Sequence, residues 1–425
     1  MENQQDIDAL HQLSMSLDYD SSENQETFKL PSGRSMTTEQ LLLKVISFGT
    51  NYSKSVAYYK LSNILSDQNR SSIILSSGES MTKQQLLLKA IEYNPINSYQ
   101  YNNLGITLSK GESITLNNGQ SMTQQQIFLK AIEITSSFPN SYFNLALTLS
   151  EGESITLNNG QSMTEQQLYL KAIELDPTNA NSYFNLSLDL SDGESITLNN
   201  GQSMTEQQLL LKSIECDPTI SSFYYYLALT LSEEESVTLI NGQSMTENQL
   251  YLKSIDCDPT NSDSYYYLAT TLSSDETMTL LNGQSMTKQQ LLLKSIDCDP
   301  TNSCSYNSLA ITLSNGESIT LHDGQSMTEQ QLYLKAIDCD PTNSCSYYYL
   351  ALTLSIGEPI TLNNGRSMTK QQLLFEAIRL DQPETLSMIY KHLGFTLLNN
   401  KQTITLPNGE QLSRRQLLQK SRAID

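Results

Sequence analysis

The feature that most constrains the fold is a motif that recurs along the chain at a fixed interval. One copy, over residues 154–168, reads Ser-Ile-Thr-Leu-Asn-Asn-Gly-Gln-Ser-Met-Thr-Glu-Gln-Gln-Leu. Its glycine recurs every 41 residues from Gly78 to Gly365, and outer copies lie at Gly33 and Gly409. A period of roughly 20–50 residues is typical of solenoids and repeat arrays. We therefore expect one repeat array instead of several unrelated domains.

The second half of the motif predicts the start of a helix. Thr164 and Gln167 have the spacing of a capping box, in which each side chain bonds the backbone amide of the other residue. Met163 and Leu168 have the spacing of a hydrophobic staple. The methionine recurs in every copy except the last, where Leu412 replaces it. An apolar packing role therefore explains this column better than metal or ligand binding does.

The first half of the motif predicts a short β-hairpin. Ile155 and Leu157 alternate with polar residues before an Asn-Gly pair. A two-residue type I′ loop and a type I turn with a glycine bulge would give different strand registers. Pro31 and Pro407 in the outer copies favour the type I turn, which pairs Ile155 with Met163. Strands this short leave open whether the hairpins join into a continuous sheet or stand apart.

A second helical pattern precedes each hairpin. Tyr142, Leu145, Ala146 and Leu149 have the i, i+3, i+4, i+7 spacing of one apolar helix face. The helix after the hairpin ends before Pro177. Each unit thus reads helix, hairpin, helix, turn, and neighbouring units must stack to bury their apolar residues. We expect a single array over residues 1–425 with approximate units 6–48, 55–94, 98–135, 139–176, 180–217, 221–258, 262–299, 303–340, 344–381 and 387–425.

These residues resemble the tetratricopeptide repeat, a helix–turn–helix unit of about 34 residues. The resemblance is carried by Tyr142-x-x-Leu145-Ala146-x-x-Leu149, Tyr169-x-x-Ala172-Ile173 and Leu175-Asp176-Pro177-Thr178-Asn179. It implies a mainly α fold: an α-solenoid of about ten helix–hairpin–helix repeats in a right-handed superhelix, with short β-hairpins along one edge. Glu165 departs from the family pattern, because the family places a small residue early in its second helix.

Composition narrows the function classes. The 425 residues carry a net charge of −21, which disfavours nucleic acid and acidic membrane surfaces as partners and favours basic ones. The first residues lack the basic and apolar regions of a secretory signal, and no run approaches the roughly 18 apolar residues of a membrane span. We expect a cytoplasmic protein.

The sequence gives no sign of an enzyme or of a bound cofactor or metal. His11, His322 and His392 lie in different units, and neither a phosphate-binding loop nor a nucleophile elbow is visible. The cysteines follow the repeat in two columns, Cys216, Cys257, Cys298 and Cys339, and Cys304 and Cys345. Their spacing is not that of a zinc site, and we expect free thiols.

The resemblance implies that the first helices line a concave groove for an extended peptide or a partner helix. The two positions after Tyr142 and its equivalents would face that groove, and aromatic residues there suit an interface. The candidate contacts are Phe143, Asn144, Phe184, Asn185, Tyr225, Tyr226, Tyr266, Tyr267, Tyr348 and Tyr349. Alternatively, these side chains fill the space between adjacent first helices. The basic ladder with which relatives bind chaperone tails is reduced to Lys60 and Lys391, so such tails are not expected partners.

Two functions of different class follow. The first is a non-enzymatic scaffold that binds a protein segment. The second is a structural protein that self-assembles end to end or through its hairpin edges. The terminal units distinguish them, because polar outer faces keep an array monomeric and apolar ones join copies. Acidic columns such as Glu153 and Glu174 fit a solvated face, or a surface for a basic partner.

Overall fold

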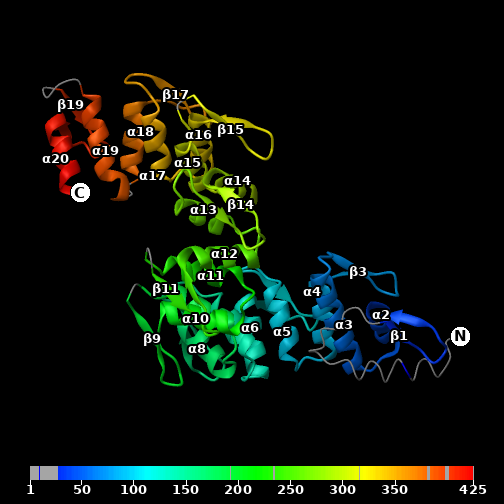
Figure 1. Cartoon of the computed structure of the whole chain (residues 1–425). Helices are drawn as coiled ribbons and strands as arrows, with labels where there is room; N and C mark the ends of the chain where they lie inside the picture. Colours follow the sequence, from blue (N-terminus) through cyan, green and yellow to red (C-terminus); the bar gives the residue numbers. More distant parts are fainter. Residues whose placement is uncertain are drawn as a thin grey trace. The chain divides into compact units, whose positions relative to one another are not determined.

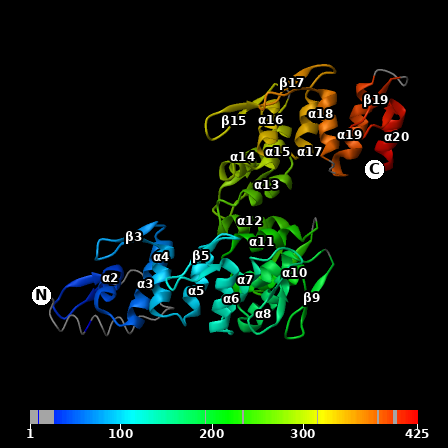
Figure 2. The same ribbon diagram turned by 180° about the vertical axis from the view of Figure 1, so that it is seen from behind.

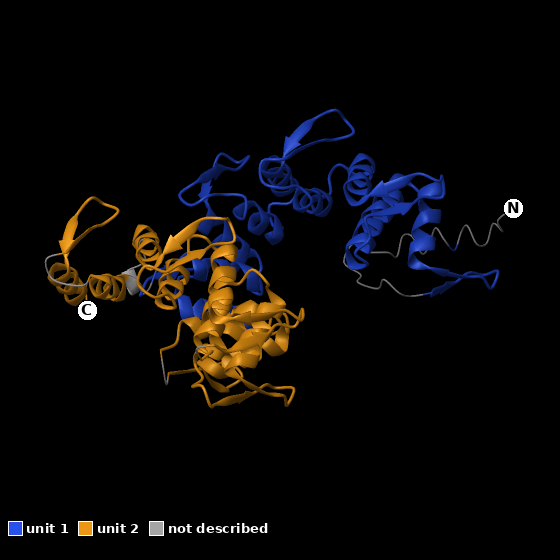
Figure 3. Cartoon of the chain, turned by 90° about the horizontal axis from the view of Figure 1, so that it is seen from above, with its two compact units in different colours: residues 1–216 blue, residues 217–425 orange. Residues whose placement is uncertain are grey.

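The computed structural model describes residue 9 and residues 27–191, 193–232, 235–314, 316–380, 383–397 and 402–424. The chain forms two compact units, Met1–Cys216 and Asp217–Asp425 (Figure 3). Within each unit, pairs of helices alternate with two-stranded hairpins in chain order (Figures 1 and 2). The first helix expected from Leu10 lies outside the described residues.

The described helices of the first unit are α2 (Thr38–Phe48), α3 (Asn51–Asp67), α4 (Lys83–Tyr93), α5 (Ser98–Ile106), α6 (Gln124–Ile134), α7 (Pro139–Ala146), α8 (Glu165–Leu175), α9 (Ala180–Leu188) and α10 (Glu206–Cys216). Its hairpins are β1 (Thr27–Lys29) with β2 (Ser35–Thr37), β3 (Ser72–Ile74) with β4 (Ser80–Thr82), β5 (Ser113–Thr115) with β6 (Ser121–Thr123), β7 (Ser154–Thr156) with β8 (Ser162–Thr164), and β9 (Ser195–Thr197) with β10 (Ser203–Thr205).

The described helices of the second unit are α11 (Ser221–Leu229), α12 (Glu247–Cys257), α13 (Ser262–Thr270), α14 (Lys288–Cys298), α15 (Ser303–Ile311), α16 (Glu329–Cys339), α17 (Ser344–Leu352), α18 (Lys370–Arg379), α19 (Pro383–Thr396) and α20 (Arg414–Ile424). Its hairpins are β11 (Ser236–Thr238) with β12 (Ser244–Thr246), β13 (Thr277–Thr279) with β14 (Ser285–Thr287), β15 (Ser318–Thr320) with β16 (Ser326–Thr328), β17 (Pro359–Thr361) with β18 (Ser367–Thr369), and β19 (Thr403–Thr405) with β20 (Gln411–Ser413).

The second helices begin as predicted. In α8, the Thr164 amide donates to Gln167 Oε1 at 3.0 Å and the Gln167 amide donates to Thr164 Oγ1 at 3.4 Å. This reciprocal pair satisfies two amides that have no partner inside the helix. Met163 and Leu168 both lie in the hydrophobic core. The capping box therefore fixes where each hairpin ends and its helix begins.

The hairpins have the predicted register. Ile155 pairs with Met163, the Leu157 amide donates to the Gln161 carbonyl at 2.8 Å, and the Gly160 amide donates to the Leu157 carbonyl at 2.9 Å. Gly160 has a φ of +86°, the left-handed conformation that a type I turn with a glycine bulge needs. In the described residues each hairpin is a separate two-stranded sheet, which answers the question of a continuous sheet left open by the sequence.

Most of the described first helices are shorter than their apolar pattern predicts, although α3 contains its whole pattern through Leu65. α7 ends at Ala146, so Leu149 lies beyond the helix although its side chain is buried. The Leu149 amide donates to the Ala146 carbonyl at 2.9 Å, a tightened last turn that brings the side chain back to the core. Consecutive helices, such as α7 with α8 and α8 with α9, pack on one another to form this core.

A polar contact links each of several hairpins to the preceding repeat. The Glu174 carboxylate accepts from Lys171 Nζ at 2.7 Å and from Asn199 Nδ2 at 2.6 Å. We call this three-residue contact the clasp; equivalent clasps join Glu133 to Lys130 and Asn158. The acidic column late in the second helix thus pairs with groups of its own chain.

The Glu165 column, where the sequence departs from the family pattern, reaches the end of the preceding first helix. Glu165 accepts from Tyr169 Oη at 3.0 Å. In other repeats Lys288 Nζ donates to the Leu272 carbonyl at 3.0 Å, and Gln124 Nε2 donates to the Leu108 carbonyl at 2.6 Å. A long polar side chain here can therefore supply a partner to a carbonyl near the end of the first helix.

Candidate functional site

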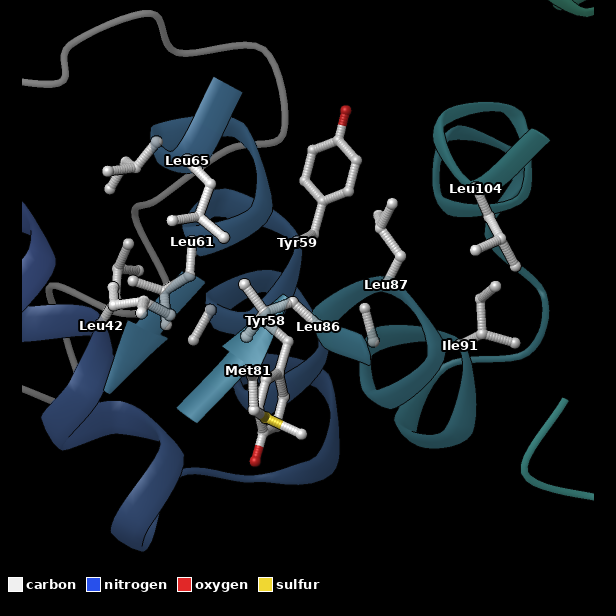
Figure 4. Close-up of a cluster of buried hydrophobic side chains, with 14 of the residues drawn as sticks. Leu42, Tyr58, Tyr59, Leu61, Leu65, Met81, Leu86, Leu87, Ile91 and Leu104 are labelled. Atoms are coloured by element: carbon white, nitrogen blue, oxygen red, sulfur yellow. The ribbon is translucent and has the colours of Figure 1, made fainter. Parts of the chain in front are cut away.

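The tyrosine that opens each first-helix pattern is a core residue, which we call the packing tyrosine. In α3 this is Tyr58, and Figure 4 shows its side chain directed toward Met81 of the hairpin. The next residue, Tyr59, leaves the helix in the opposite direction (Figure 4). We call the two positions after the packing tyrosine the aromatic face.

Side chains of the aromatic face contact one another between successive first helices. Asn103 Nδ2 of α5 donates to Tyr59 Oη of α3 at 3.1 Å. Asn144 Nδ2 of α7 donates to Asn102 Oδ1 of α5 at 2.9 Å. In both cases the first position of one repeat contacts the second position of the next. The side chains of the aromatic face therefore connect one first helix to the next.

The same relation holds in the second unit. The ring centroids of Tyr225 on α11 and Tyr267 on α13 are 5.7 Å apart. Tyr348 Oη on α17 lies 3.2 Å from Nδ1 of His392 on α19, with the two ring centroids 5.6 Å apart. The alternative reading, that these residues fill space between first helices, therefore describes part of their role.

The predicted site residues differ in how accessible they are. Tyr348 is only 2% exposed and contacts His392 instead of solvent. The remaining candidates are half-buried, which leaves part of each side chain accessible: Phe143, Asn144, Phe184, Asn185, Tyr225, Tyr226, Tyr266, Tyr267 and Tyr349. Asn185 bonds its own helix, because its Nδ2 donates to the Asn181 carbonyl at 2.9 Å.

Sequence reasoning missed the aromatic residues that the second helices add to this face. Tyr251 of α12 lies with its ring centroid 5.7 Å from Tyr267 and 6.2 Å from Tyr225. Tyr333 of α16 stacks on Tyr349 at 5.9 Å. The sequence did contain a signal for these residues. One position of the second helix is Tyr in some repeats and Leu in others, and Glu stands four residues earlier wherever Tyr occurs.

The hydroxyls of this face are protonated at neutral pH, because the usual tyrosine pKa of about 10 lies well above 7. Burial moves the pKa of Tyr266 further up, to about 12, with smaller contributions from Cys304 and Tyr267. Burial, followed by the neighbouring Tyr267 and Asp263, raises the pKa of Tyr225. At neutral pH these tyrosines therefore offer neutral O–H donors and not phenolate charges.

The acidic column before each hairpin belongs to a turn. The Glu153 carboxylate accepts from the Ser150 amide at 2.9 Å, and the same bond recurs between Ser191 and Glu194 at 3.1 Å. Gly152, with a φ of +74°, lies in this turn. These carboxylates close the chain reversal after the first helix.

Cavities lie between the hairpins and the second helices in both units. A pocket of about 440 Å³ is lined by Tyr142, Met163, Gln167, Lys171 and Asn199, among others. A pocket of the same volume recurs in the second unit, where His322 takes the place of the asparagine. The same cavity thus occurs in one repeat of each unit.

No metal centre is evident in the part of the chain that the structure describes, because none of its His, Cys, Asp and Glu side chains form a group of three suited to an ion. The described cysteines are free thiols, and Cys298 Sγ lies 3.6 Å from the Pro259 carbonyl. Among the described helices, none combines the length and apolar character needed to cross a bilayer.

Comparison with known families decides the identity of the repeat. The sequence model of the tetratricopeptide repeat matches residues 86–126, 127–167, 168–208, 209–247, 250–290, 291–331 and 332–372. This chain belongs to the tetratricopeptide repeat family. Each matched segment runs from a second helix through the next first helix and its hairpin, so the tetratricopeptide pattern spans the insertion. Tetratricopeptide repeats bind peptides or proteins, and membership favours an interaction scaffold.

Solved structures of tetratricopeptide proteins resemble the chain only distantly. YrrB, described as having an unusual peptide-binding site, is 15% identical over 54% of this chain and 100% of its own, with a TM-score of 0.31. Yeast Tom70 is 12% identical over 98% of this chain and 68% of its own, with a TM-score of 0.32. A human IFIT1 dimer with PPP-AAAA is 13% identical over 80% of this chain and 68% of its own, with a TM-score of 0.35. No curated protein matches.

Proposed function

We propose that this chain is a non-enzymatic scaffold that binds an extended segment of a partner protein along the aromatic face. The observation that carries the proposal is the series of half-buried aromatic and asparagine side chains at the same two positions of successive first helices. Such residues combine contact area with hydrogen-bond donors and lose little side-chain entropy on binding. A cytoplasmic location and a basic partner remain predictions that accompany it.

A pull-down from cell lysate tests the proposal. The variant Phe143→Ala, Phe184→Ala, Tyr226→Ala, Tyr266→Ala removes four half-buried side chains of the face and keeps the packing tyrosines. Circular dichroism must first show that it folds. We expect a partner held by the native chain to be lost from this variant.

The hairpin turns provide a matched control. Ile240 is 63% exposed and Leu281 is 58% exposed, at a position where other repeats have asparagine. The variant Ile240→Asn, Leu281→Asn changes apolar surface away from the aromatic face and should keep the partner. Retention of the partner by the aromatic-face variant would overturn the proposal. Loss of the partner from the hairpin variant alone would also overturn it and would indicate that the partner binds the hairpins.

A further inference from the structure

The aromatic face is richest in tyrosine in the second unit. Three first helices there carry two consecutive tyrosines after the packing tyrosine, and α15 carries Asn307 and Ser308 at those positions. We call the half-buried members the tyrosine surface: Tyr225, Tyr226, Tyr266, Tyr267 and Tyr349.

The paired rings have one recurring geometry. Tyr225 and Tyr226 have centroids 5.1 Å apart and planes at 80°. Tyr266 and Tyr267 repeat this arrangement at 5.1 Å and 79°. In such a pair the edge of one ring meets the face of the other, and the two planes form an angled apolar corner. A compact, rigid, apolar ring can pack into such a corner, and proline carries one.

The spacing of the corners matches a polyproline II helix. The two corners lie on neighbouring first helices, because the ring centroids of Tyr225 on α11 and Tyr267 on α13 are 5.7 Å apart. The axes of packed helices are roughly 8–10 Å apart. A polyproline II helix rises about 3.1 Å per residue with three residues per turn, so it advances about 9 Å per turn. Every third residue of such a ligand would therefore meet the next first helix.

The hydrogen-bonding groups of a polyproline II ligand also complement those of the tyrosine surface. A polyproline II helix makes no internal hydrogen bonds, and proline has a carbonyl acceptor but no N–H donor. The tyrosine surface carries neutral hydroxyl groups, because the usual tyrosine pKa of about 10 keeps the O–H protonated at neutral pH. A ligand that needs only donors from its receptor fits this surface.

Charge restricts which residues can flank the prolines of the ligand. α11, α13, α15 and α17 contain one charged residue, Asp263, whose carboxylate accepts from Asn302 Nδ2 at 3.2 Å. Together with the net charge of −21, this disfavours acidic residues in the ligand and favours basic ones.

We propose that the tyrosine surface binds proline-rich segments with basic flanking residues in the polyproline II conformation. This inference rests on the proposed function, because it names the chemistry of the segment that the aromatic face binds. Aromatic-lined surfaces suit such ligands because polyproline II is already extended and loses little entropy on binding.

Titration of the full chain with labelled peptides tests this inference. The probe is a run of about nine prolines, three turns of polyproline II, with lysines at both ends. One control peptide replaces every proline with alternating glycine and serine, and another replaces the lysines with glutamates. We expect the probe to bind at least about tenfold more tightly than either control, a difference of about 1.4 kcal/mol.

Two variants locate the binding. Tyr226→Leu with Tyr266→Leu removes two hydroxyls and two ring corners while keeping apolar bulk, and should weaken probe binding at least about tenfold. Ile240→Asn with Leu281→Asn should leave it unchanged. Equal affinity for the proline and glycine–serine peptides, or unchanged affinity in the tyrosine variant, would overturn the inference.

The two proposals fail in different ways. If the probe does not bind but the pull-down partner is lost from the aromatic-face variant, the scaffold proposal stands and the proline-rich ligand is wrong. If the aromatic-face variant retains the partner and the tyrosine variant binds the probe as the native chain does, both proposals are wrong.

Discussion

Gly105 lies where a first helix approaches its second helix so closely that a side chain would not fit. A Cβ at this position would come within 2.5 Å of Phe128 Cε1, and Phe128 is 1% exposed. Most other repeats have Ala or Ser at the glycine position and Leu or Tyr opposite it, and Gly394 faces Leu418 at a looser 3.3 Å. The glycine and the phenylalanine therefore form a matched pair.

We predict that Gly105→Ala destabilises the first unit and that Phe128→Leu reverses the effect. Overpacking costs about 1–3 kcal/mol, which exceeds the gain of about 1 kcal/mol from replacing glycine inside a helix. In the Phe128→Leu background the clash is absent and only the helix gain remains. Urea denaturation of the four members of this double-mutant cycle should give a coupling of at least about 1 kcal/mol. Additive effects would show that the ring can move aside.

Asp189 replaces a threonine that caps other first helices. Thr148 Oγ1 donates to the Leu145 carbonyl at 2.7 Å, whereas an ionised carboxylate has no proton to donate. Burial raises the pKa of Asp189 to about 6, and Glu165 and Glu151 add to the shift. Protonation of Asp189 is therefore coupled to folding.

We predict that Asp189→Thr stabilises the protein at pH 7 and much less at pH 4. The folded-state pKa lies above the unfolded value of about 3.9, so stability is fully present below that value and falls as pH rises through about 6. The gain at pH 7 should stay below about 1 kcal/mol, because Asp189 is only partly covered by the protein and solvent screens its charge. Thermal denaturation at both pH values measures it, and an equal gain at both would contradict the coupling.

At the scale of elements, local chemistry allowed most of the fold to be predicted. The capping box at Thr164 and the turn glycine at Gly160 act over a few residues, so the sequence alone located the second helices and the hairpin register. The end of α7 before Leu149 depends on packing against the neighbouring helix, which a periodic pattern does not contain. The aromatic face shows the same limit. Its positions were predicted, but the burial of Tyr348 by His392 requires two repeats to meet.

We predict that Thr164→Ala loosens the start of α8. Loss of such a cap costs about 0.5–2 kcal/mol, which corresponds to amide exchange roughly two- to thirtyfold faster in the first turn. Ser162→Ala is the control, because Ser162 Oγ makes only an exposed bond to Ser154 Oγ at 3.2 Å. Mass-spectrometric hydrogen exchange over residues 165–168 makes the comparison. Equal rates in the two variants would show that the hairpin, and not the cap, fixes the helix start.

At the scale of the whole molecule, α20 is polar at positions where other second helices are apolar. Arg422 of α20 is exposed at the position that Ile173 occupies in α8, where the isoleucine is buried. Gln419 likewise takes the place of Leu170. These substitutions favour the adaptor over end-to-end assembly, the alternative function considered from the sequence.

We predict that Gln419→Leu with Arg422→Ile makes the chain associate. The double change restores the apolar residues that an internal repeat presents to its neighbour, so a second copy can stack on the exposed end. Sedimentation should show a mass that rises with concentration, whereas the native chain and an Ala423→Glu control should stay monomeric. Self-association of the native chain would instead support the structural function.

The clasp has a consequence for how the chain unfolds. Asn199 binds Glu174, whereas Leu281 stands at the equivalent position opposite Asp256, and His322 Nδ1 lies 4.0 Å from Asp297 Oδ1. In a linear array, stability is close to a sum of nearest-neighbour terms. Successive interfaces of unequal strength should let the repeats around Leu281 separate before those around Asn199. Denaturation would then proceed in stages, and one melting temperature would describe an average over a chain that comes apart in segments.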